Sequence, residues 1–81
     1  MIVKVTVTPR KGILDPQGRA TEGALRSLGF GNVKSVNVGR YILLEIDAAS
    51  KAEAAQRTRE MCDQLLANPL IEDYRFEVED G

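Results

Sequence analysis

Apolar and polar residues alternate over three stretches of the chain, which is typical of strands with one buried face. In residues 2–8 every second position is a valine, with lysine or threonine between. The stretch "NVKSVNVGRYILLEID" alternates on both sides of Gly39-Arg40, which predicts two strands joined as a hairpin. Apolar and polar residues alternate once more in residues 71–78, which predicts the last strand. The sequence therefore predicts four strands.

Two stretches carry apolar residues at helical spacing instead. The first is predicted to begin at Pro16, because the carboxylate of Asp15 can cap free amides and proline has no amide to lose. It is expected to end at Gly29, with Phe30 folding back on Leu25. Gly18 and Gly23 are costly inside a helix, so each position indicates either a close contact or a weak helix.

The second helix is predicted to begin at Ser50, because "SKAE" matches a capping box, and to stop at Asn68-Pro69. Its predicted buried stripe consists of Ala54, Thr58, Met61, Cys62 and Leu65. The resulting order β-α-β-β-α-β predicts an α+β fold, a single domain over residues 1–81. It is the ferredoxin-like sandwich, with both helices on one face of an antiparallel sheet. Tyr41 and Leu43 then lie on the uncovered face and are candidates for a subunit interface.

Composition narrows the chemistry that this chain can perform. There is no histidine among the 81 residues, which removes the commonest general base near neutral pH and the commonest metal ligand. The single cysteine, Cys62, is expected to be a small core residue. We therefore expect no catalytic, cofactor or metal site on this chain, and a thin core of this size favours association with other chains.

Charge and hydropathy bear on partners and location. A formal net charge of −1 argues against nucleic acid as a partner. No apolar run is long enough to span a bilayer, and "MIVKVTV" begins a strand pattern, so we expect no membrane partner and a cytoplasmic location. The charge is uneven: residues 1–40 hold seven basic and two acidic side chains, and residues 41–81 hold four and ten. Either a solvated surface or complementary faces would account for this bias.

The stretch "PRKGILDPQGRATEGALRSLGF" leaves several functions open. Arg10 and Lys11 after a strand indicate either a solvated loop or an anion site. A metallochaperone would need paired cysteines here, and an RNA-recognition module would need aromatics on its central strands. A regulatory domain of the ACT type, which binds small molecules at this loop, remains the alternative.

Four segments taken in order, "KGILDPQGRA", "LRSLGF", "VNVGRYILLEID" and "NPLIEDYRFEVED", resemble the PurS family. This family supplies the small subunit of phosphoribosylformylglycinamidine (FGAM) synthase in purine synthesis. The resemblance implies an accessory subunit that associates with itself as a dimer or tetramer. It further implies that the chain holds a glutaminase subunit and a large synthetase subunit together and supports ammonia transfer. ATP and Mg are expected on the large subunit. Under this hypothesis Arg10, Lys11 and Arg40 are the partner-docking candidates.

Overall fold

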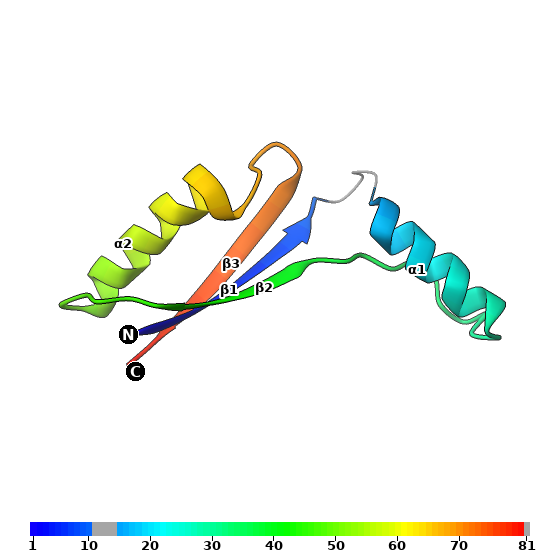
Figure 1. The fold of residues 1–81 in the computed structure, drawn as a ribbon, viewed down its shortest axis with the longest axis horizontal. Coiled ribbons are helices and arrows are strands. Elements are labelled where there is room, and N and C mark those ends of the chain that lie inside the picture. Colours follow the sequence, from blue (N-terminus) through cyan, green and yellow to red (C-terminus); the bar gives the residue numbers. More distant parts are fainter. Residues whose placement is uncertain (11–14, 81) are drawn as a thin grey trace.

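The computed structural model describes residues 1–10 and 15–80 and contains one antiparallel sheet. The elements are β1 (Ile2–Pro9), α1 (Pro16–Ser27), β2 (Arg40–Glu45), α2 (Lys51–Met61), the π-helical turn η1 (Cys62–Leu66) and β3 (Glu72–Glu79). The strand order is β2-β1-β3, so β1 is central (Figure 1). These elements confirm the predicted α+β class and the antiparallel sheet.

The core forms on the face of the sheet that α2 covers. The valines at positions 3, 5 and 7 of β1 are completely buried, as their alternation predicts. Val5 lies between Ile42 of β2 and Phe76 of β3, and these neighbours are only partly buried. Cys62 and Ala67 close the cluster from the end of α2. Cys62 is therefore a core residue, and burial raises the pKa of its thiol.

One turn of π-helix changes which side chains the second helix buries. The amide of Ala67 donates to the carbonyl of Cys62 (3.0 Å), a bond that spans five residues instead of four. The extra residue rotates the following side chains, so that Leu66 packs on the core and Leu65 is 82% exposed. The prediction that Leu65 belongs to the buried stripe is therefore wrong, as is that for Met61, which is 37% exposed.

Helix α1 ends and begins as its sequence predicts. The Asp15 carboxylate accepts from the amide of Gly18 (3.0 Å) and also from that of Val38 (2.8 Å). At the other end Gly29 has a φ of 100°, and the amide of Phe30 donates to the carbonyl of Leu25 (3.0 Å). Asp15 therefore caps the helix and also ties it to the segment that follows.

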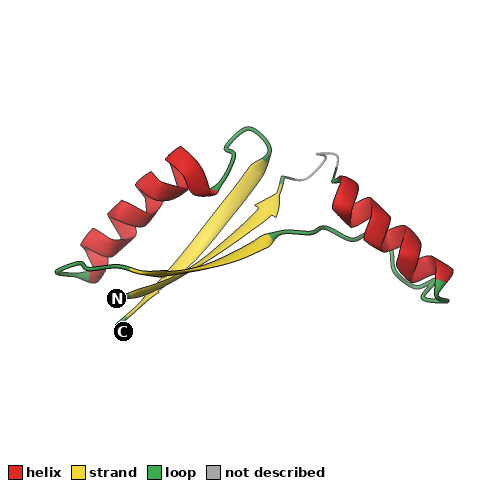
Figure 2. Cartoon of the chain, in the orientation of Figure 1, coloured by secondary structure: helices red, strands yellow, loops and turns green. Residues whose placement is uncertain are grey.

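The position of α1 differs from the predicted one. Figures 1 and 2 show α2 over the sheet and α1 beyond the opposite end of it, with residues 33–39 running back along α1. Besides the bond from Val38 to Asp15, the Arg26 guanidinium donates to the carbonyl of Val33 (3.1 Å). Gly18 is buried, and a side chain there would collide with the carbonyl of Val36. We call α1 and the segment bonded to it, residues 15–39, the arm.

The predicted hairpin at Gly39-Arg40 is not closed within this chain. Residues 33–39 form no strand and lead directly into β2 instead of folding back beside it, so the described residues contain three strands and not four. The physical reason is that this segment follows α1, to which Asp15 and Arg26 bind it, and α1 lies off the sheet. Consequently only α2 lies on the sheet, and the expectation of two helices on one face is not met in the described chain.

The cap at Asp15 makes the stability of the arm depend on pH. Hydrogen bonds from Gly18 and then from Val38 lower the pKa of the Asp15 carboxyl. A lowered pKa means that the stabilising contribution is complete above the unfolded value of about 3.9 and is lost as the pH falls through the folded value. We expect Asp15→Asn, which keeps a capping oxygen but no charge, to unfold at a lower temperature than the wild type at pH 7. The two melting temperatures should converge as the pH falls below about 4; a gap that stays constant down to pH 2 would contradict the assignment.

Candidate docking surfaces

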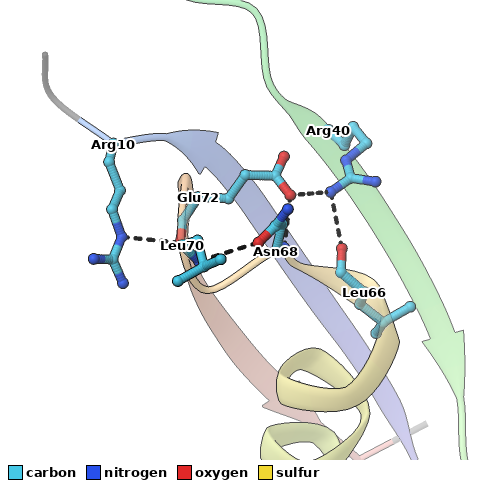
Figure 3. A network of polar contacts seen from close by, with 6 residues as sticks. All are labelled: Arg10, Arg40, Leu66, Asn68, Leu70 and Glu72. Carbon is cyan, nitrogen blue, oxygen red and sulfur yellow. Dashed lines mark hydrogen bonds and ion pairs between the residues drawn. The ribbon is translucent and has the colours of Figure 1, made fainter. Parts of the chain in front are cut away.

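The turn between α2 and β3 is fixed by an arginine from β2 (Figure 3). One nitrogen of Arg40, Nη2, donates to the carbonyl of Leu66 (2.9 Å) and pairs with Oε1 of Glu72 (2.7 Å). The same Glu72 oxygen accepts from the amide of Asn68 (2.8 Å). The Asn68 side chain in turn accepts from the amide of Leu70 (3.1 Å). Arg40 and Glu72 therefore hold this turn against the beginning of β2.

Arg10 binds the same turn from the end of β1. Its amide donates to the carbonyl of Ile71 (2.9 Å), and its Nε lies 3.4 Å from the carbonyl of Glu72 and 3.3 Å from Oδ1 of Asp73. The structure thus brings Arg10 and Arg40 to one region, as a shared docking role requires. Both have partners within the chain, and about half of each side chain is exposed (47% and 53%). Lys11, the third candidate, lies outside the described residues.

Two exposed leucines lie close in the sequence to Leu66 and Glu72, which these arginines bind. Leu65 is 82% exposed and Leu70 is 80% exposed. The sequence analysis missed both as candidates. Leu65 was assigned to the core because its helical spacing gave no sign of the π-helical turn. The only signal for Leu70 was its place in an apolar stretch directly after Asn68-Pro69. We call Arg10, Arg40, Leu65 and Leu70 together the turn surface.

We expect Glu72→Ala to lower the free energy of unfolding by about 1–2 kcal/mol, because it leaves Arg40 and the Asn68 amide without their shared acceptor. Glu72 has 22% of its side chain exposed, so part of this loss is recovered by water. The matched control is Asp73→Ala at the next residue, whose 65% exposed carboxylate makes one ion pair. It should change stability by less than about 0.5 kcal/mol in the same urea titration. Equal losses for both variants would show that the Glu72 network adds nothing beyond surface charge.

Tyr41 and Leu43 lie on the face of the sheet opposite α2, and both are 63% exposed. Each is in register with polar residues across the sheet: Tyr41 with Thr6 and Arg75, and Leu43 with Lys4 and Glu77. Lys4 pairs with Glu79 at 2.9 Å, and this hydrogen bond raises the pKa of the lysine. The structure therefore places both candidates on an open, mixed apolar and charged face, where their role as interface residues stays a prediction. We call this face, with Tyr41 and Leu43 on the edge strand β2, the open face.

No group of three or more His, Cys, Asp or Glu side chains in residues 1–10 and 15–80 is arranged to hold a metal ion. Within the same residues, no helix is both long and apolar enough to cross a membrane. Burial raises the pKa of Tyr74, and the hydrogen bond from its hydroxyl to Asp63 (3.1 Å) adds to the shift.

Comparisons of sequence and of structure with known proteins point to the same family. Residues 2–80 match the PurS family, described as phosphoribosylformylglycinamidine (FGAM) synthase. The PurS subunit of this synthase from Synechocystis is 45% identical over 75 residues, which cover 93% of this chain and 75% of the relative. The structure of Bacillus subtilis PurS in a C2 crystal form is 44% identical with a TM-score of 0.88, covering 98% of both chains.

A further relative comes from an assembly. A chain in the structure of PurLQS from Thermotoga maritima is 32% identical, with a TM-score of 0.81 over 95% of this chain and 96% of that one. Sequence and fold thus agree from the first strand to the last, and this chain belongs to the PurS family.

Proposed function

We propose that this chain is an accessory subunit of phosphoribosylformylglycinamidine synthase, a ligase of purine biosynthesis. The observation that carries the proposal is the match to PurS subunits of this synthase over more than 90% of this chain, together with the likeness to a chain of PurLQS. The absence of histidine from the sequence agrees with a role in assembly, because the commonest catalytic base is not available. The reaction then belongs to the complex and not to this chain.

In the proposed assembly the chain bridges a glutaminase subunit and a large synthetase subunit. The glutaminase subunit releases ammonia from glutamine. The synthetase subunit uses this ammonia to convert formylglycinamide ribonucleotide (FGAR) to the amidine FGAM. ATP with Mg, bound on the large subunit, activates the amide oxygen of FGAR. This chain contributes surfaces that keep the two subunits together and help to keep ammonia from escaping. The cytoplasmic location stays a prediction.

The turn surface is the site that we assign to docking on the large subunit. Arg10 and Arg40 are held in place by the 66–72 turn, so less conformational entropy is lost when a partner binds them than for free surface arginines. The two exposed leucines of the turn surface supply the apolar contact that a stable interface needs at its centre. The open face, with Tyr41 and Leu43, is the second contact, which we assign to packing against another sheet.

The test is reconstitution of the synthase from its three subunits, with glutamine or ammonium as the nitrogen donor. We expect glutamine-dependent FGAM synthesis to require this chain, and ammonia-dependent synthesis to persist largely without it. If neither association nor turnover depends on the chain, the accessory role is wrong.

Two variants test the turn surface in the same assay. Leu70→Glu places a charge in the turn that Arg10 and Arg40 bind, and it should weaken assembly at least about tenfold, as expected for loss of a central apolar contact. Ala52→Glu adds the same charge at an exposed position in the first turn of α2 and should leave assembly unchanged. Equal behaviour of the two variants would remove the turn surface from docking and leave the accessory role intact.

A further inference from the structure

The sheet carries a hollow that is open to solvent and large enough for a small molecule. Its volume is about 490 Å³, within the range of about 300–1,000 Å³ that small-molecule sites occupy. The residues that line it are Lys4, Thr6, Tyr41, Arg75, Phe76 and Glu77. They come from all three strands, so the hollow lies on a rigid part of the molecule, as a binding site requires. We call it the open-face hollow.

The register of the sheet arranges the polar and aromatic groups of the hollow in two rows. Tyr41, Thr6 and Arg75 lie opposite one another on β2, β1 and β3. Lys4 and Glu77 lie opposite each other in the next row. Neighbouring strands are about 4.8 Å apart, and alternate residues of one strand are about 7 Å apart. Measured along the sheet, Arg75 is therefore about 7 Å from Glu77 and about 10 Å from Tyr41. A ligand must be elongated to touch all three.

The charges in the hollow indicate which kind of ligand fits. Lys4 pairs with Glu79 (2.9 Å), so its charge is already neutralised. In the described part of the chain, neither Arg75 nor Glu77 makes an ion pair. A phosphate group, with a charge of about −2, would pair with Arg75 but would be repelled by Glu77. A ligand that carries one charge of each sign matches both side chains.

We propose that the open-face hollow binds a free α-amino acid with an aromatic side chain. The α-carboxylate pairs with the guanidinium of Arg75, whose forked donors match a carboxylate, and the α-ammonium group pairs with Glu77. The side chain of the ligand crosses β1 over Thr6 toward the ring of Tyr41, which is 63% exposed and accessible for stacking. A long, flat side chain spans this distance, whereas that of alanine leaves Tyr41 without contact.

This inference does not depend on the proposed function, because it concerns the open face while that face is free. A second sheet packed on the open face, as assigned above, would cover Tyr41. The amino acid and that sheet would therefore compete for one surface, and bound amino acid would weaken the packing of the sheets.

Equilibrium dialysis of the full chain against radiolabelled L-phenylalanine tests the site. We expect saturable binding of one ligand per chain, with a dissociation constant below about 1 mM. Unlabelled analogues then compete for the site: 3-phenylpropionate lacks the ammonium group, phenethylamine lacks the carboxylate and L-alanine lacks the ring. Each should bind at least about tenfold more weakly than L-phenylalanine, because each loses one of the three contacts. No saturable binding of L-phenylalanine, or equally tight binding of 3-phenylpropionate or inorganic phosphate, would overturn the proposal.

Variants of the two exposed charged residues locate the site on the open face. Arg75→Gln should weaken binding of L-phenylalanine at least about tenfold. Glu77→Gln should do the same but should not weaken binding of 3-phenylpropionate, which has no cation for this carboxylate. The matched control, Arg57→Gln, removes an arginine of α2 that is 60% exposed and should leave binding unchanged. Circular dichroism checks that all three variants fold. Unchanged binding in both open-face variants, or an equal loss in the control, would refute the assignment.

Discussion

Val5→Asp should abolish folding, whereas the same replacement at the next residue, Thr6→Asp, should be tolerated. Val5 is completely buried on the central strand, in register with Ile42 and Phe76. A carboxylate there has no polar partner, and an unpaired buried charge costs several kcal/mol, roughly the whole stability of a small domain. Thr6 points to the open face opposite Arg75, where a carboxylate meets a positive charge in water.

The measurement is far-ultraviolet circular dichroism with a thermal melt of both variants and the wild type. We expect no cooperative transition for Val5→Asp and a melting temperature within a few degrees of the wild type for Thr6→Asp. The reverse order, or two folded variants, would show that the face assignment of β1 is wrong. Loss of folding should also remove the chain from any complex, so this variant is a negative control for the reconstitution.

Local chemistry was sufficient to predict most elements and their ends. The alternation of valines predicted which face of β1 is buried, because a strand exposes every second side chain to the same side. Asp15 and Ser50 act as caps: the Ser50 hydroxyl accepts from the amide of Glu53 (3.1 Å), and the Glu53 carboxylate accepts from the amide of Ala49 (3.0 Å). These interactions span a few residues, so they can be recognised from the sequence.

Features that depend on distant parts of the chain could not be predicted in this way. Alternation around Gly39 indicates extended backbone but does not reveal whether this segment pairs with β2 or lies along α1, as it does in the structure. The π-helical turn that exposes Leu65 breaks the regular helical spacing from which buried positions were predicted. Similarly, Arg10 and Arg40 are 30 positions apart and meet only because β1 ends and β2 begins beside the same turn. Their proximity to each other is a tertiary property.

Gly18→Ala should destabilise the arm strongly, whereas Gly23→Ala in the same helix should stabilise it. A side-chain carbon at Gly18 would collide with the carbonyl of Val36 and with the carboxylate of Asp15. Since backbone must move to relieve the clash, we expect a loss of about 2 kcal/mol, in the range found for overpacked sites. At Gly23 nothing lies within 4 Å of the added carbon. The substitution should therefore raise the stability by the difference in helix propensity between alanine and glycine, about 1 kcal/mol.

The two variants make a matched pair because both replace glycine by alanine within α1. Chemical denaturation should separate them by about 3 kcal/mol in opposite directions from the wild type. Equal stabilisation by both substitutions would show that α1 and residues 33–38 do not move as one body, and the arm as defined above would not exist.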